Sequence, residues 1–221
     1  IVNQAGKLAQ ELTTTVGAIL DPVPLAGGAV AVLPTKLQLL GLPGGLRASD
    51  FLGTVEQQDT VQWASVVPVD DEHILVTDLT GNIMRVEYRT NPKPHLQSIE
   101  TLEVGAKVHV APAVEKGRMV VTDETGRTQL LDVVGFRQDA DIKLSAPAFG
   151  ALAIVGDRLL VQSEDQKLHC LAMDQKLEEV WSIEMGKDAM SGTPLLEGDS
   201  IIFGTMNGKV LTLNAKTGEE Q

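Results

Sequence analysis

Besides its 30 Asp and Glu residues, this chain has few side chains that could carry out catalysis or bind metals: four histidines and a single cysteine. The histidines are His73, His95, His109 and His169. They show no H-E-x-x-H spacing and no other arrangement of metal ligands on one element. Cys170 has no second cysteine to pair with, which excludes an internal disulfide and a multi-cysteine metal site. It stands next to His169 in an expected strand, where neighbours point to opposite faces, so we interpret Cys170 as a small buried apolar residue.

The carboxylates stand where tight turns need them. Asp78 and Asp123 each occur in the sequence Val-Thr-Asp-x-Thr-Gly, at the start of two equivalent turns. Asp favours such positions because its short side chain bonds to nearby backbone. A calcium loop would need alternating acidic residues, which neither segment has. No Gly-x-Ser-x-Gly motif and no helix-opening glycine loop for phosphate is present. The sequence therefore predicts no catalytic residue and no metal site.

Composition and charge limit the kind of partner. The chain has 221 residues and a net charge of −12, which opposes binding to duplex nucleic acid or to an anionic membrane surface. This charge fits either a soluble protein that resists self-association or a protein whose partner is basic. Aromatic residues make up only 3% of the chain, so aliphatic side chains must fill the core. No apolar run approaches the roughly 20 residues of a membrane helix. A chain that opens on Ile-Val-Asn-Gln and stops inside a repeat is expected to be trimmed.

The elements that position these residues follow an internal repeat. Five short apolar runs, each bounded by turn-forming residues, recur at steps of 44, 45, 40 and 42 residues. Their central residues are Val32, Val76, Val121, Val161 and Phe203. Each run is expected to be the second of four antiparallel strands in its unit. Four strands in 40–45 residues is the period of a β-propeller blade, so we predict an all-β propeller of about five blades that forms a single domain over residues 1–221.

Both ends of the chain leave an alternative open. The last unit lacks a fourth strand, and residues 8–15 could supply it and close the ring, although Ala5–Leu12 also permits a short helix. Alternatively, the five blades are part of a larger ring, whose other blades belong to missing sequence or to another chain. The segment Gly41–Val55 is expected to be the longest loop.

Turn residues mark the hairpin between the second and third strands. Gly81, Gly126 and Gly208 occupy equivalent positions, and the fourth unit has Gln166 there. The pair Asn207-Gly208 predicts a type I′ turn, in which both central residues have positive φ.

A family resemblance is carried by the C-terminal third. The run Leu213–Glu219, Leu-Asn-Ala-Lys-Thr-Gly-Glu, together with Gly204–Val210 before it, resembles the repeat of the quinoprotein (pyrroloquinoline-quinone-like) β-propellers. Gly218 belongs to this motif, and Trp181 stands where that family places its blade-docking tryptophan. The motif covers roughly residues 160–221, and the architecture covers the whole chain.

The resemblance implies one of two functional classes. Quinoprotein dehydrogenases hold pyrroloquinoline quinone and calcium at the ring centre, beside a catalytic Asp and often a disulfide of adjacent cysteines. Cofactor-free members, WD40-like in architecture, are scaffolds that bind other proteins through their loops, and they imply a periplasmic or cell-envelope location. Cys170 cannot form the cysteine pair, and the aromatic content is low for a stacked cofactor.

His109 is the one histidine placed where a ligand could reach it. It lies in Val108–Val114, an expected first strand, and first strands line the channel of a propeller. There it could contact a ligand or ion, or it could be a hydrogen-bonded lining residue.

The sequence therefore favours a scaffold without a cofactor that binds a protein partner through its loops. A quinoprotein dehydrogenase, or a fragment of one, is the first alternative, and a propeller that binds a small ligand or carbohydrate is the second.

Overall fold

The computed structural model describes residues 14, 17–42, 44, 46–53, 61–174 and 176–221. The chain divides into two compact units, Ile1–Glu103 and Val104–Gln221. Its described strands form five antiparallel sheets, and each sheet is built from consecutive strands. We number these sheets blades 1 to 5 in chain order. Residues 8–13 and 15, which were expected to complete the last blade, lie outside the described residues.

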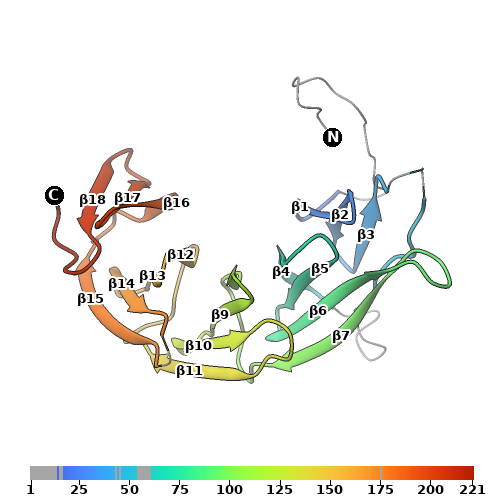
Figure 1. Ribbon diagram of the computed structural model, residues 1–221, viewed down its shortest axis with the longest axis horizontal. Coiled ribbons are helices and arrows are strands. Elements are labelled where there is room, and N and C mark those ends of the chain that lie inside the picture. The colour runs from blue at the N-terminus through green and yellow to red at the C-terminus, as the bar shows by residue number, and fades with distance from the viewer. Residues whose placement is uncertain (1–13, 15–16, 43, 45, 54–60, 175) are drawn as a thin grey trace. The chain divides into compact units, whose positions relative to one another are not determined.

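Unit 1 contains blades 1 and 2 (Figure 1). Blade 1 has three strands: β1 (Leu20–Leu25), β2 (Gly28–Leu33) and β3 (Lys36–Leu40). Blade 2 has four: β4 (Trp63–Pro68), β5 (His73–Asp78), β6 (Asn82–Arg89) and β7 (His95–Glu103). An isolated bridge from Phe51 to Leu37 lies where a fourth strand of blade 1 would run.

Unit 2 contains blades 3, 4 and 5 (Figure 1). Blade 3 has the strands β8 (Ala113–Glu115), β9 (Arg118–Thr122), β10 (Arg127–Asp132) and β11 (Gln138–Lys143). Blade 4 has β12 (Ala153–Val155), β13 (Arg158–Gln162), β14 (Lys167–Ala172) and β15 (Glu178–Glu184). Within the described residues, blade 5 has three strands: β16 (Met190–Glu197), β17 (Ser200–Thr205) and β18 (Val210–Asn214).

The five apolar runs that recur along the sequence all form the second strands of their sheets. In blades 1 to 4, apolar residues on both faces of these strands are buried, whereas on β17 of blade 5 only the face with Ile201 and Phe203 is buried. Val161 on β13 belongs to the core shared with blade 3, whereas Leu160 belongs to the core shared with blade 5. In unit 1, Val32 and Val76 join one core between blades 1 and 2. The central residues of the five runs therefore recur at a regular spacing because each blade contributes one layer of apolar side chains to the core.

Two strand positions differ from those expected. The first strand of blade 3 was expected over Val108–Val114, but β8 begins at Ala113. Pro112 has no N–H to donate to a strand ladder, so the chain before it runs as a connection. The polar run Asp141–Ser145 was expected to be the fourth strand of this unit, but β11 already begins at Gln138. Its first residues are exposed and polar, so no apolar pattern marks where the strand begins.

The turn at Asn207-Gly208 also differs from the expected type. Gly208 has a φ of 77°, but Asn207 is not among the described residues with positive φ. The amide of Thr205 donates to the carbonyl of Lys209 at 2.9 Å, and the amide of Gly208 donates to the carbonyl of Thr205 at 3.0 Å. The three-residue loop therefore ends in a left-handed glycine and is not a two-residue type I′ turn. The same loop recurs at Gly81 and Gly126, whose φ values are 96° and 86°.

Trp181 and Gly218 join blades 4 and 5. The Trp181 indole Nε1 donates to the carbonyl of Ala215 at 3.0 Å. A Cβ on Gly218 would lie 2.7 Å from Cδ2 of that ring, so only glycine allows this approach. Blade 4 thus holds the end of β18 through one aromatic side chain.

Candidate functional site

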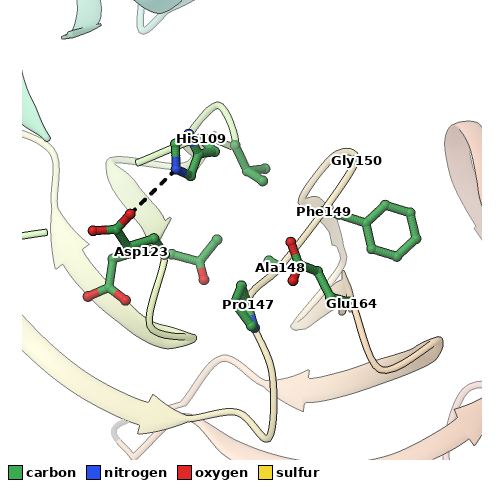
Figure 2. A pocket seen from close by; sticks show the side chains of 10 residues that line it. His109, Asp123, Pro147, Ala148, Phe149, Gly150 and Glu164 are labelled. Atoms are coloured by element: carbon green, nitrogen blue, oxygen red, sulfur yellow. Dashed lines mark ion pairs between the residues drawn. The ribbon is translucent and has the colours of Figure 1, made fainter. Parts of the chain in front are cut away.

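A pocket with a volume of about 400 Å³ opens between blades 3 and 4 of unit 2 (Figure 2). Four chain segments line it: the connection before β8, the β9–β10 turn, the β11–β12 connection and the β13–β14 turn. The lining residues discussed below are His109, Asp123, Glu124, Pro147, Phe149 and Glu164. His109 and Asp123 form one side of the pocket, and Glu164 lies on the other beyond Pro147 and Ala148 (Figure 2).

Backbone hydrogen bonds hold the pocket walls. The amide of Glu124 donates to the carbonyl of Lys107 at 2.8 Å, which fixes the β9–β10 turn on the connection before β8. In the same way, the amide of Glu164 donates to the carbonyl of Pro147 at 2.9 Å, and that of Phe149 donates to Gln162 at 2.9 Å. Because both turns are tied to neighbouring connections, the side chains at the pocket are presented by a preorganised backbone.

The pocket is acidic. Asp123, Glu124 and Glu164 contribute carboxylates, and no described lysine or arginine lines the pocket. His109 is the nearest basic group, with its Nε2 3.7 Å from Oε2 of Glu124, and both side chains are largely exposed. A site of this charge in a chain of net charge −12 attracts cationic groups.

The structure places His109 in the connection before β8 and at the edge of this pocket. Its role toward a ligand stays a prediction. The other histidines lie elsewhere: His73 contacts Asp70 through Nδ1 at 2.8 Å, and His95 contacts the carbonyl of Lys93.

A Ser–His–Glu arrangement, which the sequence analysis missed, lies inside blade 4. Ser163 Oγ is 2.8 Å from Nε2 of His169, and His169 Nδ1 is 2.5 Å from Oε2 of Glu179. Ser163 directly follows β13, His169 lies on β14 and Glu179 lies on β15, so the register of the sheet, and not sequence spacing, brings them together. Distances of this kind also occur in catalytic triads.

The side chains of Ser163, His169 and Glu179 are engaged in contacts inside blade 4. Hydrogen bonds from Ser145 and Ser163 lower the pKa of Asp165, so its carboxylate is ionised at neutral pH and can only accept. Ser163 donates its one hydroxyl hydrogen to this carboxylate. Ser163 is also completely buried.

Cys170 has the environment of a structural residue. It is 0% exposed, and burial raises the pKa of its thiol to about 12. A thiol with so high a pKa is not a nucleophile at neutral pH. His169 lies on the opposite face of β14 and contacts Ser163 and Glu179, as the alternation of a strand requires.

Within the described residues, no group of three or more His, Cys, Asp and Glu side chains is arranged to hold a metal ion. Asp78 and Asp123 accept hydrogen bonds from their own turns. No described helix is long and apolar enough to cross a membrane.

The five sheets of consecutive antiparallel strands, with these loops between them, define an all-β protein of the β-propeller class. The chain belongs to the family of the outer membrane protein assembly factor BamB, whose family model matches residues 48–221. This match confirms the expected quinoprotein-like repeat. A search of curated proteins found no match.

Solved structures agree with this fold. BamB from Moraxella catarrhalis aligns with a TM-score of 0.56 and 14% identity, over 71% of this chain and 46% of that chain. Hsv2 from Kluyveromyces lactis aligns with a TM-score of 0.60 and 13% identity, over 85% of this chain and 57% of that chain. BBS1N, solved in complex with ARL6DN, aligns with a TM-score of 0.62 and 16% identity, over 86% of this chain and 61% of that chain. The chain thus spans 46–61% of the length of these structures.

Proposed function

We propose that this protein is a non-enzymatic scaffold that binds a basic segment of a partner protein at the acidic pocket between blades 3 and 4. The observation that carries this proposal is the pocket itself, where carboxylates from two turns meet on a preorganised backbone with no described lysine or arginine among its lining residues. In contrast, Ser163 and His169, two buried polar residues of blade 4, already make hydrogen bonds within the blade.

Family membership supports a role in outer membrane protein assembly and a location in the bacterial cell envelope. A member of this family has that role in its name, and a β-propeller neighbour was solved in complex with a protein partner. We infer that the partner of this chain is likewise a protein, and that its contacting surface is rich in lysine or arginine.

A charge-reversal experiment tests the proposal. The variant Glu124→Lys/Glu164→Lys places two cations in the pocket and is expected to abolish capture of the partner from envelope extracts of the source organism. The control Glu115→Lys/Glu178→Lys makes the same charge change outside the pocket, in β8 and β15. Capture that is lost equally in both variants would point to net charge alone and would contradict the assigned site.

The open face of blade 5 supports a second contact. Leu195 and Val210 lie on one face of this blade and are 58% and 72% exposed. In blades 3 and 4 the corresponding face, with Val120 and Leu160, is fully buried by the next blade. We infer that a further blade covers this face of blade 5 in the functional assembly.

A further inference from the structure

Blades 2 and 3 contain two turns of nearly the same design. In blade 2, Oδ1 of Asp78 accepts hydrogen bonds from the Thr80 amide (2.9 Å), the Thr80 hydroxyl (2.7 Å) and the Asn82 amide (3.0 Å). In blade 3, Oδ1 of Asp123 accepts the corresponding three from Thr125 and Arg127, at 2.8, 2.6 and 3.1 Å. The first carboxylate oxygen is therefore satisfied in the same way in both turns.

The second carboxylate oxygen differs between the two turns. In blade 2, the side-chain amide of Asn82 donates to Oδ2 of Asp78 at 2.8 Å. The corresponding residue in blade 3 is Arg127, whose guanidinium turns away to Asp141 (3.0 Å) and Gln138 (3.1 Å). The ammonium of Lys143, also near this turn, donates to the carbonyl of Thr125. Oδ2 of Asp123 consequently accepts no hydrogen bond from any described residue.

This unpaired oxygen belongs to a residue that is only 6% exposed and that lines the acidic pocket. Because Oδ1 is already satisfied by its own turn, Oδ2 is the acceptor that this carboxylate offers to the pocket, and it favours a ligand that brings a charged donor. Glu124 and Glu164 line the same pocket and add negative charge.

The chemistry of the pocket favours a guanidinium over an ammonium. Guanidinium is planar, is weakly hydrated and presents several donors at once, so it can bond to Oδ2 of Asp123 and to a neighbouring carboxylate together. Pro147 and Ala148 provide an apolar floor on which its plane can lie. An ammonium gives up its water less readily at a site of low exposure.

We propose that the pocket binds an arginine side chain of the partner, and that Oδ2 of Asp123 is the atom that anchors its guanidinium. This inference rests on the proposed function and names the residue type that the pocket selects. Blade 3 has Arg127 where blade 2 has Asn82, and Arg127 does not donate to the aspartate of its turn through its side chain. Oδ2 of Asp123 is therefore available to a ligand, whereas Oδ2 of Asp78 is occupied by Asn82.

The test is a titration of the isotope-labelled chain with N-acetyl-arginine amide, followed by the backbone amide resonances of residues 122–127 and 163–167. We expect saturable shifts at these turns, with weak affinity because a single side chain is bound. Asp123→Asn is expected to lower the affinity about tenfold or more, since a charge-assisted hydrogen bond is lost.

Arg127→Asn is the sharper variant, because it restores the donor found in blade 2. The new amide is expected to occupy Oδ2 and lower the affinity about tenfold, even though the chain becomes more negative. Arg137→Asn makes the same charge change in the exposed β10–β11 turn and is expected to leave binding unchanged. Thermal unfolding of each variant shows whether the fold is retained.

Three results would overturn the inference. They are equal binding of the neutral analogue N-acetyl-citrulline amide, equal binding of N-acetyl-lysine amide, and arginine binding that Arg127→Asn leaves intact. The proposed function can fail independently, because partner capture depends on the whole surface and the titration depends on one side chain.

Discussion

At the residue scale, one position in blade 4 holds a side chain that its turn disfavours. Gln166 has a φ of 68°, in the left-handed region, and Gly81, Gly126 and Gly208 occupy the same place in the other turns. A side chain with a Cβ in this conformation costs about 1–2 kcal/mol, part of which the added chain entropy of a glycine offsets. We predict that Gln166→Gly raises the free energy of unfolding by about 0.5–1 kcal/mol, as measured by urea denaturation.

The matched control is Gly126→Ala in blade 3. A Cβ there would lie 2.8 Å from the carbonyl oxygen of Ala146, and φ is 86°, so this variant is expected to lose stability. If Gln166→Gly were destabilising as well, the left-handed strain assigned to residue 166 would be refuted.

Asp165 makes stability depend on pH in the acid range. Hydrogen bonds from Ser145 and Ser163 lower its pKa below the ordinary value of 3.8. A carboxyl group whose pKa is lower in the folded state contributes stability above its unfolded pKa, and this contribution is lost as the pH falls through the folded pKa. We predict that the stability difference between the wild type and Asp165→Asn is constant from pH 7 to pH 5 and shrinks below about pH 4.

Urea denaturation at several pH values measures this difference. A gap between the two proteins that widened on acidification would contradict the assigned hydrogen bonds. Asp139→Asn is the control, since Asp139 is paired with the exposed Arg137.

The sequence could predict only part of the site. Asp123 was recognised as a turn residue, which its hydrogen bonds show, but its unpaired oxygen depends on where the Arg127 side chain goes. Comparing positions 82 and 127 in the two turns was the signal that could have found it. The contact of Ser163 with His169 and Glu179 was hidden, because strand register alone brings these residues together.

At the element scale, the Trp181–Gly218 contact joins two blades. Gly218→Ala would push a methyl group into the indole ring at a residue whose φ is 74°. Left-handed strain and overpacking together predict a loss of about 2–4 kcal/mol. Thermal unfolding followed by tryptophan emission measures this loss.

Gly186→Ala is the matched control for this substitution. Gly186 also has a positive φ (59°), but a Cβ there would meet nothing within 4 Å. Equal losses in the two variants would show that backbone strain, and not the ring contact, determines the effect.

Strand positions were predictable where burial imposes a pattern. The second strands are buried on both faces in blades 1 to 4 and on one face in blade 5, and their apolar runs marked all five sheets. The outermost strand β11 is polar, so its start at Gln138 could not be read from its residues. The late start of β8 at Ala113 was signalled by Pro112, whose effect on the ladder was underestimated.

At the scale of the whole molecule, the uncovered face of blade 5 predicts self-association. Exposed apolar side chains gathered on one sheet face drive association, and Leu195 and Val210 are 58% and 72% exposed. We predict that Leu195→Asp/Val210→Asp shifts the sedimentation of this chain toward the monomer at high concentration. The free energy of unfolding should change by less than about 1 kcal/mol, since both side chains are in water. An unchanged sedimentation profile would contradict a docking role for this face.

The central claim is that the turns between blades 3 and 4 bind the partner, and hydrogen exchange of the chain with and without its captured partner tests it most directly. The account predicts slower exchange at residues 107–110, 122–126, 147–150 and 163–166, which line or support the acidic pocket. Exchange at the opposite ends of the same blades, in the turns 115–118 and 155–158, should stay unchanged. Protection confined to those opposite turns, with none at the pocket, would contradict the account.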